Sequence, residues 1–289
     1  MAVLSIQSHV VYGYAGNTAA VFPLQRLGRE VWAINTVEFS NHTGYGAWRG
    51  KILGADLTSE LVLGLEERGV LNQCEAVLSG YLGDGAVGEA IINAVKKVRK
   101  ESSGALYACD PVMGDTGRGF YVKPDIPEMF KKKLVPLADI VTPNQFELEA
   151  LTGINIKNVY DAIKAINILH EMGPSIILLT SFKEKDGELS MIASDRTQMF
   201  RTTTAELPLD GGVAGTGDMT SAVFLSRYLE TKNLEKTLEL CTASVFSILE
   251  DSYKTFSLEK DSNMELKFIT FQQQFVSPAH YFKVEKITL

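Results

Sequence analysis

The chain has 289 residues, of which 45% are hydrophobic and 22% are charged, a composition typical of a globular protein with a large buried core. Its formal net charge of −7 and the lack of any run of five or six basic residues argue against a nucleic-acid surface. No apolar stretch reaches 18 residues, and no basic segment precedes the first apolar residues, so we expect neither a membrane span nor export. These features predict a cytoplasmic protein without nucleic-acid or membrane partners.

The cysteines and the segment boundaries give two further expectations. Cys74, Cys109 and Cys241 are widely spaced and form no C-x-x-C motif, which is typical of buried thiols in a reducing compartment. The sequence contains no linker-like segment, low-complexity tract or internal repeat. We therefore predict a single domain over residues 1–289.

Short apolar, β-branched runs alternate with amphipathic helical patterns along the first two thirds of the chain. Helices are predicted at 88–101 and 159–173, the second closing with Gly173 as its C-cap. Repeated strand-then-helix units predict a mostly parallel sheet covered by helices on both faces, that is, a three-layer α/β/α fold. The predicted strands are 2–6, 31–37, 76–81, 105–112, 139–144 and 175–180.

The last third of the chain has a different pattern. Residues 188–207 alternate between polar and apolar side chains, which predicts an antiparallel edge of the sheet. Residues 217–230, 234–250 and about 257–275 have helical patterns.

Polar residues follow most of the predicted strands. In open α/β sheets the ligand binds beyond the carboxyl ends of the strands. Turn chemistry explains each of these residues taken alone, but their placement at one sheet edge indicates a ligand site. They are Ser8, His9, residues 38–46, Gly80, Tyr81, Asp110, Pro111, Thr142, Pro143, Asn144, Thr180 and Ser181.

Two glycine-rich segments are candidates for binding phosphate. The first, "GDGAVG" at 83–88, matches the G-x-G-x-x-G fingerprint of dinucleotide-binding folds. It follows a later strand instead of opening the sheet, and Asp84 would repel a pyrophosphate. We therefore favour an ordinary turn and helix start over a dinucleotide site.

The second segment, "VAGTGDMTSA" at 213–222, resembles a Walker A loop but has Asp218 where the lysine would stand. The glycines allow backbone N–H groups to turn inward, and the following helix adds its N-terminal N–H groups. A carboxylate there fits a general base that takes a proton from a substrate hydroxyl, while Gly215, Thr216 and Gly217 stabilise the developing phosphoryl charge. The alternative role for Asp218 is a helix N-cap, and the spacing does not separate the two.

Residues 114–124 contain several glycines together with Asp115, Arg118, Tyr121 and Lys123. This composition fits a flap that closes over phosphate and excludes water. A solvated surface loop is the alternative interpretation.

Several motifs in this chain resemble those of pyridoxal kinases, in the ribokinase-like superfamily. They are "SIQSHVVYGYAGN", "FSNHTGYGAW", "SGYLGDG", "CDPVMGD", "ADIVTPNQFELEALTG" and "GTGD". The resemblance covers essentially the whole chain, and it implies a ribokinase-like fold and ATP-dependent phosphorylation of the 5′-hydroxyl of pyridoxal, pyridoxamine and pyridoxine. It also implies a homodimer and a flap at 114–124.

The resemblance further implies which residues bind each ligand. It assigns Asp218 as the catalytic base and Gly215, Thr216 and Gly217 as the anion hole. The vitamin is expected to contact Ser8, His42, Thr43, Gly44, Tyr81, Tyr121 and Asp218. ATP is expected to contact Asp110, Thr142, Asn144, Glu147, Thr180, Ser181, Leu207, Pro208, Leu209, Asp210 and Thr216.

Metal ions are expected near the phosphates. Carboxylates beside a triphosphate repel it unless a metal lies between them, so Mg²⁺ is required, and the resemblance adds a monovalent cation such as K⁺. The residues expected near Mg²⁺ or K⁺, directly or through water, are Asp110, Asp115, Thr142 and Glu147. The alternative role of Glu147 is an acid in the first turn of a helix.

One departure and two rival functions remain. Thr180 stands where some pyridoxal kinases have a lysine, a difference that bears on ATP affinity or rate and not on the reaction. The rivals are another ribokinase-like kinase, for a hydroxymethylpyrimidine or a sugar, and a B6-binding protein without catalysis.

Overall fold

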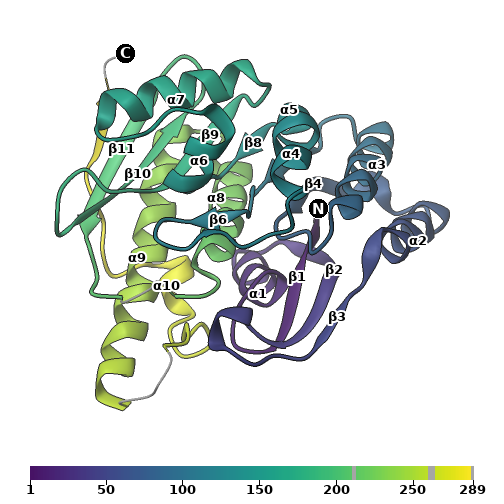
Figure 1. Ribbon diagram of the computed structural model, residues 1–289, viewed down its shortest axis with the longest axis horizontal. Coiled ribbons are helices and arrows are strands. Elements are labelled where there is room, and N and C mark those ends of the chain that lie inside the picture. Colours follow the sequence, from purple (N-terminus) through teal and green to yellow (C-terminus); the bar gives the residue numbers. More distant parts are fainter. Residues whose placement is uncertain (210–212, 260–263, 288–289) are drawn as a thin grey trace.

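The computed structural model describes residues 1–209, 213–259 and 264–287. Ten of its strands form one sheet, in the order β12-β11-β10-β9-β8-β5-β4-β1-β2-β3, and β6 and β7 form a separate hairpin (Figure 1). The strands are β1 Ala2–Tyr12, β2 Glu30–Asn41, β3 Gly50–Ile52, β4 Cys74–Ser79, β5 Leu106–Cys109, β6 Gly114–Asp115, β7 Gly119–Phe120, β8 Ile140–Val141, β9 Ile176–Phe182, β10 Glu188–Ser194, β11 Met199–Ala205 and β12 Val284–Ile287.

Helices cover both faces of this sheet. They are α1 Asn17–Arg26, α2 Gly54–Glu67, α3 Gly85–Glu101, α4 Ile126–Met129, α5 Val135–Leu137, α6 Gln145–Thr152, α7 Val159–Glu171, α8 Thr216–Thr231, α9 Leu234–Glu259 and α10 Gln273–Val276. Short helical turns occupy η1 Thr43–Tyr45, η2 Leu71–Gln73 and the π-helical turn η3 Phe130–Leu134. In the described ranges, no helix is long and apolar enough to cross a membrane.

Two hydrophobic cores lie on opposite faces of the sheet. Alternate side chains of each central strand enter different cores, as in β5, where Tyr107 and Cys109 enter one and Ala108 the other. The first core packs against α2, α3, α6 and α7, and the second against α1, α8 and α9. Because successive side chains of a strand point to opposite faces, strands with continuous apolar runs become buried on both sides. The three-layer α/β/α prediction is confirmed.

The strand order places a ligand crevice at one edge. Strands β2, β1, β4, β5, β8 and β9 pair in parallel, while β3, β10, β11 and β12 pair antiparallel at the two ends. The chain passes from β1 to β2 on one side and then to β4 on the other side of β1. Such a reversal opens a crevice at the carboxyl ends of the two flanking strands.

Two strands are longer than the sequence predicts. Pairing between β1 and β2 continues as far as Tyr12 opposite Asn41, with a register irregularity between Gln7 and His9. Ser8 and His9 therefore lie within β1 and not after it.

The segment 188–207, predicted as an antiparallel edge of the sheet, forms the antiparallel strands β10 and β11. It is not the edge of the sheet, because β12 pairs with β11.

The predicted helix at about 257–275 is wrong over most of its length. Helix α9 reaches Glu259, and the described residues from 264 onward form turns that lead to the short α10. The N–H of Lys267 donates to the Ser252 hydroxyl on α9 (2.9 Å), so the chain bonds to the preceding helix at this point. Phe268 is buried in the core beneath α1 and α8.

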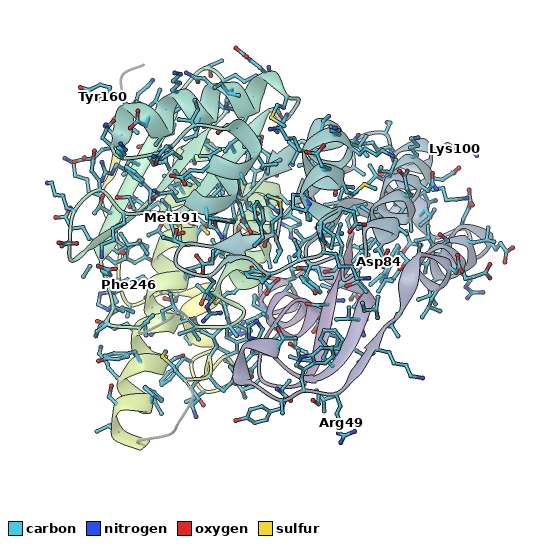
Figure 2. The ribbon with its side chains drawn as sticks, viewed as in Figure 1. Arg49, Asp84, Lys100, Tyr160, Met191 and Phe246 are labelled. Carbon is cyan, nitrogen blue, oxygen red and sulfur yellow. The ribbon has the colours of Figure 1, made fainter. Side chains whose placement is uncertain are left out.

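Segment 83–88 is an ordinary helix start, as we expected. Asp84, labelled in Figure 2, is the N-cap of α3. Its carboxylate accepts a hydrogen bond from the N–H of Ala86 (3.0 Å). The side chain also pairs with Lys123 (2.6 Å). This carboxylate occupies the helix N-terminus that a pyrophosphate would need.

Two smaller expectations are also resolved. The thiols of Cys74, Cys109 and Cys241 are free and buried, as predicted. Helix α7 ends at Glu171 with Met172 as its C-cap residue, and Gly173 follows at φ +147°. The single-domain assignment for residues 1–289 stays a prediction.

Candidate active site

A cavity of about 610 Å³ opens at the carboxyl ends of the central parallel strands. Its lining includes residues from each segment that the sequence predicted at this edge of the sheet. The predicted site residues in its lining are Ser8, His42, Thr43, Gly44, Tyr81, Asp110, Asp115, Tyr121, Thr142, Asn144, Glu147, Thr180, Gly215, Thr216, Gly217 and Asp218.

A few predicted nucleotide contacts lie elsewhere. Ser181 follows Thr180 in β9, and since neighbouring strand residues face opposite sides, only Thr180 lines the cavity. Leu207, Pro208 and Leu209 are not part of this lining either. Asp210 lies outside the described residues. The roles of these residues in ATP binding stay predictions.

Asp110 is a buried carboxylate in the cavity lining. It follows β5 and is 4% exposed. Its Oδ2 accepts a hydrogen bond from the Ser221 hydroxyl (2.9 Å), which also bonds to the Thr142 hydroxyl (2.8 Å). Burial, together with the nearby carboxylate of Asp218, raises the pKa of Asp110 to about 8. The protein alone therefore favours the protonated, neutral form of Asp110 near pH 7, and a bound cation would favour its ionisation.

Glu147 is the second buried carboxylate, with 3% of its surface exposed. It forms a capping box with Asn144 at the start of α6: Oε2 accepts from the Asn144 N–H (3.0 Å), and the Asn144 Oδ1 accepts from the Glu147 N–H (2.9 Å). Oε1 accepts from the N–H of Met113 (2.9 Å). Burial and the charge of Asp110 raise the pKa of Glu147 well above its usual range. Glu147 is thus both a first-turn acid and a wall of the cavity.

The glycine loop ends in the N-terminus of α8. Gly215 is the N-cap at φ +81°, and a Cβ there would lie 2.5 Å from the carbonyl oxygen of Tyr14. Asp218 is the third residue of α8, so the alternative role as N-cap is wrong. Its Oδ2 instead accepts a hydrogen bond from the N–H of Gly16 (2.8 Å). Burial raises the pKa of Asp218, and this N–H lowers it.

Gly217 differs from Gly215 in its surroundings. A Cβ on Gly217 would find Asp110 Oδ2 at 4.0 Å and no closer atom. Thr216, between the two glycines, donates its hydroxyl to the carbonyl of Val213 (2.9 Å). The loop therefore leaves open space beside Asp110, where a phosphoryl group would need it.

Other residues of the cavity lining carry aromatic and hydroxyl groups. Ser8 lies at the register irregularity of β1, which is where a strand can redirect a side chain. His42 caps η1, and its Nδ1 accepts from the N–H of Gly44 (3.2 Å); burial and then Arg118 lower its pKa. The carbonyl of Tyr81 accepts from the Thr36 hydroxyl (2.7 Å), and burial raises the pKa of the Tyr81 phenol.

The β6–β7 hairpin is the predicted flap. Figure 1 shows it across the edge of the sheet, between the labels of α6 and α1. Phe120 packs edge-on against Phe146 of α6 (5.0 Å between ring centroids). Tyr121 is 49% exposed, yet partial burial and the acids of the cavity, Glu147 first among them, raise its pKa. The segment therefore lies over the buried carboxylates.

Two residues that contact the cavity carboxylates, Ser221 and Gly16, were not identified from the sequence. Ser221 lies three residues after Asp218, hence on the same face of the predicted helix, and that spacing could have identified it. Gly16 gave no such signal, because its contact with Asp218 spans 202 positions.

Oxygen ligands dominate the cavity, which suits a hard cation such as Mg²⁺. Within the described residues, no group of three or more histidine, cysteine or acidic side chains could hold a metal ion alone. The raised pKa values of Asp110 and Glu147 nevertheless show that the protein alone stabilises their ionised forms poorly, so a bound cation would favour ionisation of both. The donor set therefore fits a metal that phosphate oxygens or water would also coordinate.

Comparison with known proteins identifies the class first. Residues 58–262 match the model of the phosphomethylpyrimidine kinase family. The chain is similar in fold to pyridoxal kinase from Leishmania donovani in complex with ADP and pyridoxamine, with a TM-score of 0.88 and 29% identity over 99% of each chain. It is also similar to pyridoxal kinase from Entamoeba histolytica, with a TM-score of 0.89 and 26% identity over 99% of each chain. The fold is thus that of ribokinase-like kinases.

The particular family follows from the curated sequences. The chain is 47% identical to pyridoxal kinase PdxY of Rubrobacter xylanophilus, over 99% of this chain and 97% of that protein. It is 45% identical to pyridoxal kinase PdxY of Granulibacter bethesdensis, over 98% of each. This chain belongs to the pyridoxal kinase family of the ribokinase-like superfamily, a family of ATP-dependent kinases.

Proposed function

We propose that this protein transfers the γ-phosphoryl group of ATP to the 5′-hydroxyl of pyridoxal, and also of pyridoxamine and pyridoxine. The observation that carries the proposal is the placement of Asp218 in the cavity, three residues into α8 and beside open space at Gly217. A solved structure similar to this one binds ADP and pyridoxamine, the two ligand types that the proposed reaction needs.

Asp218 acts as the general base in this proposal. It takes the proton from the 5′-hydroxyl as the hydroxyl oxygen attacks the γ-phosphorus. The N–H groups at the start of α8, with Thr216, stabilise the charge that develops on the phosphoryl oxygens. The hydrogen bond from Gly16 aims the carboxylate and offsets part of the effect of its burial.

The acidic residues hold the cations. We assign Mg²⁺ to the neighbourhood of Asp110, Asp115, Thr142 and Glu147, through water in part, and a monovalent cation such as K⁺ to the same region. Bound there, Mg²⁺ would neutralise phosphate charge. The residues would present carboxyl oxygen atoms whose ionisation a cation would favour, because burial raises the pKa values of Asp110 and Glu147. Asn144, Thr180 and Thr216 are proposed to contact the phosphates.

The vitamin ring is assigned to the aromatic and hydroxyl groups of the cavity lining. Ser8 and Thr43 offer hydroxyl groups to the polar edge of the pyridine, and Tyr81 offers a flat aromatic surface. His42, with Gly44 bonded to its ring nitrogen, shapes the turn that carries Thr43. Tyr121 closes the site from the flap. A homodimer and a cytoplasmic location remain predictions of the resemblance.

A hydroxymethylpyrimidine is a second candidate substrate. It is favoured by one observation, the match of residues 58–262 to the phosphomethylpyrimidine kinase family model. The two substrates share a heteroaromatic ring with a hydroxymethyl group, so the same base could serve either. The experiment below separates them.

The test measures ADP release with ATP, Mg²⁺ and K⁺ for pyridoxal, pyridoxamine, pyridoxine and hydroxymethylpyrimidine. We expect turnover of the B6 vitamers, and a kcat lower by about 10² or more in Asp218→Asn with ligand binding retained. Turnover of hydroxymethylpyrimidine alone would favour the second candidate. Binding of pyridoxal without any phosphorylation would leave a B6-binding protein, and wild-type kcat in the variant would remove Asp218 from the mechanism.

A further inference from the structure

Asn17, the first residue of α1, is fixed to the sheet through both ends of its side-chain amide. The residue is 2% exposed. Its Oδ1 accepts a hydrogen bond from the Ser5 hydroxyl (2.7 Å), and its Nδ2 donates to the carbonyl of Ile34 (3.0 Å) and to Oδ1 of Asn35 (2.7 Å). These partners lie on β1 and β2. The first turn of α1 is therefore tied to the two strands that flank the cavity.

Gly16, immediately before Asn17, has a backbone that only glycine can adopt there. Its φ is +57°, and a Cβ would lie 2.2 Å from the carbonyl oxygen of Ser8. This conformation directs its N–H to Asp218 Oδ2 at 2.8 Å. Gly16 has no side chain to anchor, so the anchoring falls to its neighbour.

The starts of α1 and α8 lie against each other. The N-cap of α8, Gly215, approaches Tyr14 and Ala19 so closely that a Cβ would be 2.5 Å and 3.0 Å from their atoms. Asp218 therefore lies between the N-terminal N–H groups of its own helix and the N–H of Gly16. Among the described residues, Gly16 is the only hydrogen-bond partner of the Asp218 carboxylate that lies outside α8. A shift of the first turn of α1 would move this partner.

We propose that Asn17 is a positioning residue for phosphoryl transfer: by tying the first turn of α1 to β1 and β2, it holds the Gly16 N–H against Asp218 and keeps that carboxylate aimed at the substrate hydroxyl. The inference rests on the proposed role of Asp218 as the base. Asn17 itself does not line the cavity, so a loss of substrate contacts cannot explain an effect of its substitution on turnover.

A double-mutant cycle tests this assignment. The variants are Asn17→Ala, Asp218→Asn and the two combined, with kcat and the KM for pyridoxal and ATP measured for each. We expect Asn17→Ala to lower kcat about tenfold, since small displacements of a catalytic group are costly, with both KM values within about twofold. In the Asp218→Asn background the same substitution should change kcat by less than about twofold, because the carboxylate that it positions is gone.

Two further variants guard against a folding defect. Asn35→Ala removes one partner of the Asn17 amide from β2 and should lower kcat in the same direction by a smaller factor, which decides the matter if Asn17→Ala does not fold. Asn158→Ala is the matched control: Asn158 caps α7 through the N–H groups of Tyr160 and Asp161, so it should lower the Tm without lowering kcat.

The outcomes separate the two proposals. If Asp218→Asn loses activity while Asn17→Ala and Asn35→Ala keep the wild-type kcat, the positioning role is overturned and the base assignment stands. An equal loss from Asn17→Ala in both backgrounds would overturn the positioning role as well. If Asp218→Asn keeps the wild-type kcat, both proposals fail together.

Discussion

The two sides of the cavity are built in different ways. The acid wall, which we define as Asp110, Thr142, Glu147 and Asp218, follows the ends of buried strands and the starts of α6 and α8. Each of its first three residues is at most 4% exposed, and every one of the four has a hydrogen-bond partner.

The loop wall consists of residues 42–45 and residues 114–121, which belong to the segment 114–124 predicted as a flap. Thr43, Gly44 and most of the flap are exposed, and Phe120 and Tyr121 are 53% and 49% exposed. The difference indicates a division of labour: the groups proposed for chemistry are held by rigid elements, and those proposed to select and enclose the vitamin lie on loops.

The largest effect is expected at Gly215, in the glycine loop beside the acid wall, where it meets the backbone that precedes α1. Gly215→Ala places a methyl group 2.5 Å from the Tyr14 carbonyl at φ +81°, so strain and overpacking should cost about 2–4 kcal/mol of stability. Gly217→Ala meets nothing closer than 4.0 Å and should keep the Tm. It should nevertheless slow phosphoryl transfer, because the methyl group occupies the space proposed for phosphate. Thermal unfolding and kcat of both variants check this contrast, and equal Tm losses would contradict it.

The second prediction concerns the charge of the acid wall and its dependence on pH. The folded state raises the pKa of Asp110 to about 8, so protonation of this carboxyl favours the folded apoprotein. That contribution is complete below about pH 4 and is lost as the pH rises toward 8. Asp110→Asn removes the charge and should stabilise the apoprotein at pH 8 by several kcal/mol relative to wild type, with little gain at pH 4. Its kinase activity should fall.

Thermal unfolding without Mg²⁺ or nucleotide, across this pH range, measures the effect. A wild-type Tm that does not fall relative to Asp110→Asn between pH 5 and 8 would show that the carboxylate is already neutralised in the apoprotein. Ser190→Ala, a change at a buried hydroxyl in β10 outside the cavity lining, serves as the control, since it should shift the Tm equally at both pH values.

The sequence predicted the two walls to different degrees. Asp110, Thr142 and Thr180 were identifiable because buried strands have a strong apolar signal and each of these three residues lies near a strand end. Ser8 was identified as a site residue, although it was placed after β1 and not within it, since strand length depends on pairing that only the fold defines. Leu207–Leu209 were assigned by resemblance, and the structure does not bring them to the cavity.

Long-range contacts account for what the sequence could not predict. The bond between Gly16 and Asp218 joins residues 202 positions apart, and no local pattern encodes it. The end of α9 was also misjudged, because residues near 264–272 keep a helical spacing of apolar side chains but Lys267 bonds to Ser252 instead of continuing a helix. Tertiary contacts override propensity at these positions.

The third prediction addresses the loop wall. Tyr121→Ala removes a cavity-lining side chain whose pKa is raised in part by the charges of Glu147 and Asp110. Water should then reach the bound nucleotide more easily. We expect ATP hydrolysis without acceptor to rise several-fold relative to phosphorylation of pyridoxal, with a change in stability within about 0.5 kcal/mol because the side chain is half exposed. Measuring ADP release with and without pyridoxal gives the ratio, and an unchanged ratio would remove Tyr121 from closure.

The smallest effect is expected at Thr180, where some pyridoxal kinases have a positively charged lysine. Thr180 lines the cavity and donates weakly to the Pro143 carbonyl (3.4 Å), and a lysine there would bring a positive charge toward the acid wall. The gain should be about 1 kcal/mol at partial exposure, so Thr180→Lys should lower the KM for ATP by a few-fold and leave kcat within about threefold. Ser181→Lys adds the same charge at the next position, outside the cavity lining, and should leave the KM for ATP unchanged. If both variants lower this KM equally, the effect is long-range attraction of the nucleotide and not a contact in the site, and Thr180 then has no particular role in holding ATP.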